Sequence, residues 1–208
     1  MLKRFLMGAV ATLAIANAGS AGAETAALCA NEDQAIEVQA LYKVGASARL
    51  VPALAARQLD IPEVVIASAM PAVDIAGTSA EGFEEIWTSV TQWEKAFTLI
   101  IKEGHVFEID GAVPAGKRSE RSNYFNLDID APFGGHIRSD QMSAIYALAL
   151  PGRGGSVARS IHFFDQTGVT AFSVVMGGEA GQPDEDDIAR FDTTMALVKS
   201  MGAIYPGK

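Results

Sequence analysis

Two side chains in the stretch from residue 121 to residue 140 are suited to binding a metal centre: the phenol of Tyr124 and the imidazole of His136. A tyrosine phenolate and a histidine imidazole are both donors that a haem iron takes from a protein. The two residues are twelve positions apart, in short segments that we expect to form neighbouring strands. The stretch therefore predicts an iron site, with Tyr124 and His136 as alternative ligands.

The residues around this pair favour an accessible position. Side chains alternate between the two faces of a strand, which puts Phe125 and Leu127 on the face opposite Tyr124. Phe125 and Leu127 are the natural core pair, so Tyr124 can face a groove. His136 follows two glycines, which leave room for a flat ligand near the backbone. The alternative is that Tyr124 is a core ring and His136 an ordinary packed or surface residue.

Basic side chains cluster near the pair, although the chain as a whole is acidic. They are Lys117, Arg118, Arg121 and Arg138. Basic groups recognise carboxylates such as haem propionates, and a cation beside a phenol favours its deprotonated form. We predict Lys117, Arg121 and Arg138 as cofactor-binding residues; the alternative is that these charges protect edge strands and solvate loops.

The remaining histidines have weaker claims to a functional role. Alternation gives His105 the same face as Phe107 and Ile109, predicted to be the core face, and gives His162 the same face as Phe164. The sequence has no H-E-x-x-H zinc motif, P-loop, dinucleotide glycine fingerprint or CxxC pair. These observations favour a binding protein over an enzyme.

The N-terminus has the pattern of a secretory signal peptide. A basic start at Lys3 and Arg4 is followed by an apolar run from Phe5 to Ala16 and then by Ala21-Gly22-Ala23. This predicts a signal peptide over residues 1–23, cleaved after Ala23, and a periplasmic mature protein. The apolar run is too short to span a bilayer comfortably, so we expect no membrane insertion of the mature chain.

The charge balance limits the classes of partner. The chain has 16 basic and 25 acidic residues. A chain with this excess of acidic residues is not suited to nucleic acid or to an anionic membrane surface. We therefore expect no nucleic-acid partner.

The elements that must position the site indicate one α+β domain. Residues 24–44 are predicted as a leader and first helix, and residues 45–203 as the domain. Helices are expected over 35–58 (one or two), 63–69, 78–93 with Thr78 and Glu81 as a capping box, and a last one capped by Asp184. Strands are expected over 97–102, 105–110, 124–127, 135–138, 143–150, 157–165 and 170–176. This order predicts an extended antiparallel β-sheet flanked by N-terminal helices and one C-terminal helix.

Short motifs occur in a definite order along the domain. They are Ala69-Met70-Pro71, Phe83 to Trp87, Val106 to Glu108, Pro114 to Lys117, Tyr124 to Leu127, Gly134 to Arg138 with Asp140, Ala144 to Tyr146, and Phe163 to Asp165 with Gly168. From about residue 45 to residue 201 this set resembles the haem-carrier family of the HutX/ChuX type.

The resemblance implies a haem-binding protein of haem uptake with a carrier or storage role, and not an established catalytic one. It also implies a homodimer built around an extended antiparallel sheet, and a component of a haem transporter as a further partner. Two features depart from the family pattern. Ser122-Asn123 stands where the family commonly has His-Gly or Gly-Phe, which removes a familiar donor, and the export signal differs from the family's usual cytoplasmic location.

Two other functions stay open at this point. Longer, doubled relatives of this fold are linked to haem breakdown, which makes a haem-degrading enzyme the first alternative; the lack of an internal repeat argues against it. The second is a haem-free interaction module on the same fold, which the Ser122-Asn123 departure favours.

Overall fold

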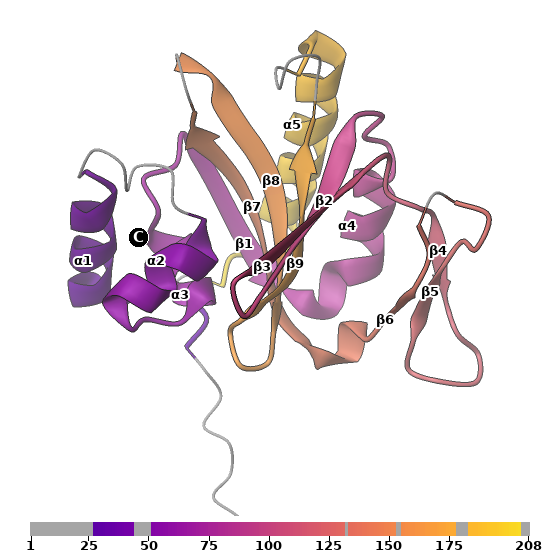
Figure 1. Cartoon of the computed structure of the whole chain (residues 1–208), viewed down its shortest axis with the longest axis horizontal. Helices are drawn as coiled ribbons and strands as arrows, with labels where there is room; N and C mark the ends of the chain where they lie inside the picture. Colours follow the sequence, from indigo (N-terminus) through magenta and orange to yellow (C-terminus); the bar gives the residue numbers. More distant parts are fainter. Residues whose placement is uncertain (1–26, 44–50, 132, 153–154, 178–182, 205–208) are drawn as a thin grey trace, which may run out of the picture.

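The computed structural model describes residues 27–43, 51–131, 133–152, 155–177 and 183–204 (Figure 1). The α-helices are α1 (Glu32–Tyr42), α2 (Pro52–Leu59), α3 (Glu63–Ala69), α4 (Phe83–Val90) and α5 (Glu185–Ser200). The strands are β1 (Asp74–Ser79), β2 (Ala96–Lys102), β3 (His105–Asp110), β4 (Gly116–Arg118), β5 (Phe125–Leu127), β6 (His136–Ile137), β7 (Met142–Pro151), β8 (Val157–Asp165) and β9 (Thr170–Met176). Within these ranges, no helix combines the length and the apolar character that crossing a membrane would need.

The strands form two antiparallel sheets. The larger has six strands in the order β1-β7-β8-β9-β2-β3, and the smaller has three in the order β4-β5-β6. β7 and β8 are the longest strands and pair along almost their whole length. The predicted α+β class, with an antiparallel sheet flanked by N-terminal helices and a C-terminal helix, is confirmed.

The N-terminal helices begin and end where local chemistry places helix boundaries. Asn31 caps α1 through a capping box, Pro52 occupies the first turn of α2, and α2 ends at Asp60 in the left-handed conformation with φ 55°. The sequence predicted one or two helices over 35–58, and the structure has two. Residues 44–50, which join these two helices in the sequence, lie outside the described residues.

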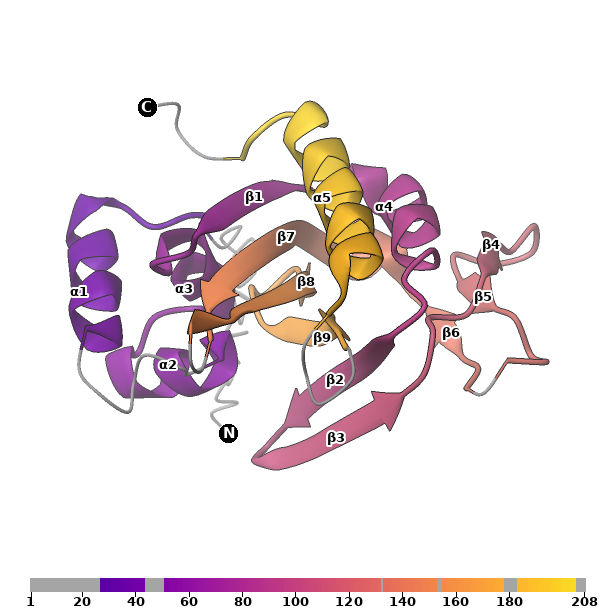
Figure 2. The same ribbon diagram turned by 90° about the horizontal axis from the view of Figure 1, so that it is seen from above.

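Alternation along β7 and β8 divides the core between the two faces of the large sheet. Tyr146 and Phe164, with ring centroids 5.8 Å apart, pack against α1–α3. Ile145 and Phe163 point the other way and pack against α4 and α5. Figure 2 shows these two groups of helices on opposite sides of the curved sheet. The middle residues of β7 and β8 are therefore buried on both faces of the sheet.

The small sheet is attached to α4 by aromatic packing. The ring of Phe125 on β5 lies 5.2 Å from that of Phe83 and 6.1 Å from that of Trp87, both measured between centroids. The indole Nε1 of Trp87 donates a 2.9 Å hydrogen bond to the carbonyl oxygen of Pro114, just before β4. Strands of two or three residues are not stable alone, so this contact holds the small sheet in place.

The helix predicted over 78–93 is wrong in its first part. Thr78 is only 1% exposed and belongs to β1, where it faces Ile145 of β7. A short 3₁₀ helix over Ala80–Gly82 follows, and α4 begins at Phe83 without a side-chain cap. β1 itself was not predicted. Pairing with β7 prevails over the local capping pattern because it buries this segment against the core.

The predicted core position of His105 on β3 is also wrong. His105 is exposed, and Phe107, on the same face, is 56% exposed. β3 is the last strand of the large sheet, and no described helix covers that end. The alternation was correct, but the sequence did not show that the strand lies at an edge.

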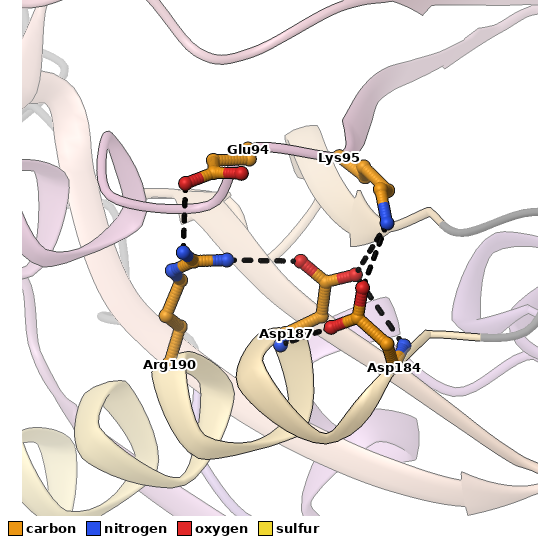
Figure 3. Close-up of polar contacts among 5 residues, drawn as sticks. All are labelled: Glu94, Lys95, Asp184, Asp187 and Arg190. Carbon is orange, nitrogen blue, oxygen red and sulfur yellow. Dashed lines mark hydrogen bonds and ion pairs between the residues drawn. The ribbon is translucent and has the colours of Figure 1, made fainter.

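A charged network holds the start of α5 against the turn between α4 and β2 (Figure 3). Asp184 and Asp187 form a capping box, and Lys95 pairs with both carboxylates, at 2.8 Å and 3.5 Å. Arg190 bridges Asp187, at 3.2 Å, and Glu94, at 2.7 Å. The hydrogen bond from Lys95 is the main reason why the pKa of Asp184 falls to about 2. The predicted cap at Asp184 is confirmed.

We expect Asp187→Ala to lower the free energy of unfolding by about 2 kcal/mol, because it removes half of the capping box and a carboxylate that serves two cations. Asp187 is 1% exposed, so water cannot replace these bonds. Urea unfolding followed by circular dichroism measures the change. Asp186→Ala, an exposed neighbour in the same turn, is the control and should change stability by no more than about 0.5 kcal/mol. Equal effects of the two substitutions would contradict this role.

The pairing of Asp184 with Lys95 predicts a loss of stability in acid. The pKa of Asp184 is lower in the folded protein than its ordinary value of 3.8, so the pairing stabilises the fold fully above that value. This contribution is lost as the pH falls from 3.8 towards about 2. Thermal unfolding at several pH values should show a shallower decrease for Asp184→Asn than for the wild type. If stability falls equally steeply with pH in Asp184→Asn and in the wild type, the pairing with Lys95 does not cause the loss of stability in acid.

Candidate functional site

Tyr124 and His136 lie side by side on the small sheet. β5 and β6 pair in a register that places Asn126 opposite His136, and Phe125 opposite Ile137. Phe125 is 3% exposed and faces α4, whereas Tyr124 is 40% exposed. The ring centroids of Tyr124 and His136 are 5.7 Å apart. The predicted neighbouring strands exist, and they bring the two candidate ligands together on the outer face.

A hydrogen bond to Asn126 orients the imidazole of His136. The Nδ1 atom of His136 lies 2.8 Å from the amide oxygen Oδ1 of Asn126. An amide oxygen only accepts hydrogen bonds, so Nδ1 is the donor in this bond and Nε2 is the ring nitrogen that it leaves for another partner. Metal-binding histidines are commonly held by such a second bond, which fixes the ring. His136 is therefore arranged to offer Nε2 to a metal.

Arg138 lies over the ring of Tyr124 but is committed to a carboxylate. Its guanidinium carbon is 5.5 Å from the ring centroid of Tyr124. It also donates two 2.7 Å hydrogen bonds to Asp140, which in addition accepts a 3.1 Å bond from Asn123. These bonds, that of Arg138 first, lower the pKa of Asp140 to about 2, while Asp140 raises the pKa of Arg138. Arg138 thus acts as a fixed cation beside the phenol.

The other predicted cations occupy three different positions. Lys117 on β4 is opposite Asn126 on β5, and Asn126 is opposite His136 on β6. These three residues therefore form a row across the small sheet, with Lys117 at one end and His136 at the other. Arg118 points to the inner face and forms a 2.6 Å ion pair with Glu84 of α4. Arg121 is exposed in the turn before β5, where its backbone N–H donates to Ser119. Lys117 alone of these three lies in the row with His136.

A hollow of about 500 Å³ adjoins this row. Lys117 and Asn126 line it together with Asp128, the buried Leu127, and Ile129, which is 87% exposed. Tyr124 and His136 are not part of this lining. The hollow thus places one cation, one carboxylate and one exposed apolar side chain beside the row that contains His136.

The donor set suits a metal that brings most of its own ligands. Within the described ranges, no three His, Cys, Asp or Glu residues gather closely enough to hold a bare metal ion. Tyr124 and His136 supply only one or two donors, which is the number that a haem iron takes from protein. The geometry therefore fits an iron porphyrin better than a free ion.

The sequence did not predict two parts of this site. Asn126 was expected on the same face as Tyr124, but its bond to His136 was not foreseen. Asp140 was included in a family motif without being given a role. Asn123 was treated only as a departure from the family pattern. Both interactions join residues ten or more positions apart, so only the pairing of β5 with β6 and the turn after β6 could reveal them.

Comparisons with known proteins agree on the family. The family model described as Haem utilisation ChuX/HutX matches residues 77–204. A similar protein is the Intracellular heme transport protein HutX of Vibrio cholerae serotype O1, 28% identical over 144 residues, which cover 68% of this chain and 73% of the relative. The predicted domain boundaries at residues 45 and 203 stay predictions.

Solved structures share the fold. The structure described as the heme binding protein ChuX has a TM-score of 0.62 at 22% identity, over 70% of this chain and 90% of its own. ChuS, described as an Escherichia coli heme oxygenase, has a TM-score of 0.54 at 14% identity, over 70% of this chain and 42% of its own. At these identities the likeness establishes the fold alone.

The comparison with HutX corrects the predicted localisation. That relative is named as an intracellular protein, so the prediction of a periplasmic protein is wrong. Residues 1–23, on which the prediction rested, lie outside the described residues.

The matched range covers more than half of the chain and includes β4–β6 with Tyr124 and His136. The solved structure of ChuX shares the fold over 70% of this chain. This protein therefore belongs to the ChuX/HutX haem utilisation family.

Proposed function

We propose that this protein binds haem and carries it in haem utilisation. The observation that supports this most directly is the pairing of Tyr124 with His136, 5.7 Å apart on the outer face of the small sheet, in a member of this family. HutX is named as a transport protein for haem, and ChuX as a protein that binds it. A non-enzymatic carrier accounts for a site that offers donors and cations but no nucleophile with its base.

In this proposal Tyr124 is the iron ligand and His136 is second to it. A phenolate suits ferric iron, and the guanidinium of Arg138 lies 5.5 Å from the ring centroid. Lys117 and Arg121 are the partners for the propionates, because Arg138 already serves Asp140. Haem supplies the iron, and the chain supplies its orientation and the charge that balances the carboxylates.

Asn123 joins the network of Asp140 instead of offering an iron donor. It helps to hold Asp140, and through it Arg138, beside the ring of Tyr124.

We expect Tyr124→Phe to weaken the binding of ferric hemin by about tenfold or more, which corresponds to about 1.4 kcal/mol. His136→Ala should have a smaller effect. Titration of each variant with hemin, followed by the Soret absorbance, gives affinity and ligand type together. His105→Ala, an exposed histidine on β3, is the control and should match the wild type. Wild-type spectra and affinities in both site variants would place the haem elsewhere.

The same complex distinguishes a carrier from an enzyme that degrades haem. ChuS shares the fold and is described as an oxygenase, although this chain spans under half of its length. A reductant is added to the hemin complex in air. A stable Soret band agrees with the carrier, whereas its loss to a biliverdin-like product would show haem breakdown.

We also propose a homodimer formed through β3. This strand ends the large sheet, so its outer edge has no partner strand among the described residues. Val106 and Phe107 are 58% and 56% exposed and point to opposite faces, so one partner strand could cover both. An exposed apolar edge strand tends to pair with another chain.

We expect Phe107→Asp to convert a dimer into a monomer, because it places a charge inside the paired edge. Light scattering coupled to size exclusion measures the mass at micromolar concentration. Ile36→Asp is the control: Ile36 on α1 is 63% exposed, and its replacement should leave the mass unchanged. A monomeric wild type would refute the dimer, and a dimeric Phe107→Asp variant would move the interface away from β3.

A further inference from the structure

Tyr124 and His136 compete for one position on an iron. The two rings lie on the outer face of the small sheet, with centroids 5.7 Å apart and planes at 58° to each other. The iron of a porphyrin has a single free coordination position on each side of the porphyrin plane. Only one of two side chains that approach from the same side can therefore bind it. The way in which each ring is held decides which of them does so.

The imidazole of His136 is held by the side chain of Asn126. Its Nδ1 atom lies 2.8 Å from the amide oxygen of Asn126, although His136 itself is exposed. Without this bond, an exposed ring on two rotatable bonds would sample several rotamers, and Nε2 would have no fixed direction. The bond therefore determines whether His136 is ready to bind a metal.

Asn126 can fix another side chain because it lies on the central strand of the small sheet. Its chain neighbours Phe125 and Leu127 are buried and belong to the core. Asn126 is opposite Lys117 of β4 on one side and opposite His136 of β6 on the other. Directly opposite residues of an antiparallel pair carry their side chains on the same face. Core packing thus sets the position of the amide, and the amide sets that of the imidazole.

The charge of the acceptor matters as well as its position. A carboxylate that accepts a hydrogen bond from a metal-binding histidine makes the imidazole a stronger donor to the metal. The amide of Asn126 is neutral, so it orients the ring without this gain. The phenolate of Tyr124, which suits ferric iron, therefore keeps its advantage.

We propose that Asn126 is a positioning residue that determines the choice of iron ligand. Its amide oxygen holds His136 ready as the second donor, and its lack of charge keeps the imidazole second to the phenolate of Tyr124. Asn126 does not itself contact the iron, and its role rests on the proposed haem-carrier function. Its bond to His136 affects haem affinity only when His136 is the ligand.

Asn126→Leu, made both in the wild type and in Tyr124→Phe, tests this role, because leucine is similar in size but accepts no hydrogen bond. In Tyr124→Phe, where His136 is the remaining donor, it should weaken ferric hemin binding by about a further tenfold. In the wild type, where the phenolate is the ligand, the change should be no more than about twofold. Gln39→Leu, the same exchange of amide for leucine on the exposed side of α1, is the matched control and should leave hemin affinity unchanged in both.

Asn126→Asp separates the position of the acceptor from its charge. In Tyr124→Phe it should preserve the hemin affinity that Asn126→Leu lowers, because a carboxylate accepts the same hydrogen bond. With Tyr124 present, it should convert part of the ferric complex from phenolate to imidazole ligation, because the carboxylate strengthens the imidazole. Electron paramagnetic resonance and the absorbance spectrum of the hemin complex report the ligand. Circular dichroism establishes that each variant is folded.

Equal losses of affinity from Asn126→Leu in the two backgrounds would show a merely structural role and overturn the inference, while the haem carrier stands. Equal losses from Asn126→Asp and Asn126→Leu in Tyr124→Phe would overturn the role of the hydrogen bond. Unchanged phenolate ligation in Asn126→Asp would overturn the role of the neutral acceptor. A wild type that does not bind hemin would refute the proposed function and this inference together.

Discussion

The aromatic contact between α4 and the small sheet is the interaction on which the candidate haem site depends. Phe83 and Trp87 enclose Phe125 on one side and contact Phe163 of the large sheet on the other. Strands β4–β6 have two or three residues each and would not persist alone. Without this cluster, nothing would hold the side chains of Tyr124 and His136 at a fixed distance from each other. The geometry of the donors is thus a consequence of core packing.

Side chains alternate between the two faces of the small sheet, so one face packs against the core and the other holds the candidate ligands. The inner face gives Phe125 to the core and Arg118 to an ion pair with α4. The outer face keeps Tyr124 and His136 accessible, with Lys117 in the same row across the strands. One-residue alternation therefore separates the residues that stabilise the sheet from those that meet a ligand.

The large sheet also presents different chemistry at its two ends. Near the small sheet, cations and metal donors suit a ligand with iron and carboxylates. Near α1–α3, the described residues that line the cavity between the helices and the sheet are mostly apolar.

The amino-acid sequence alone sufficed for the α+β class, most strands, the cap at Asp184 and the pairing of the Tyr124 and His136 segments. All of these follow from local periodicity, turn residues and family motifs, which act over a few positions. It could not predict β1, because the burial of Thr78 comes from β7, far along the chain. The exposure of β3 and the Asn126–His136 bond likewise depend on which strands become neighbours. Tertiary packing decides these features, since burial and long-range hydrogen bonds exist only once the sheets have assembled.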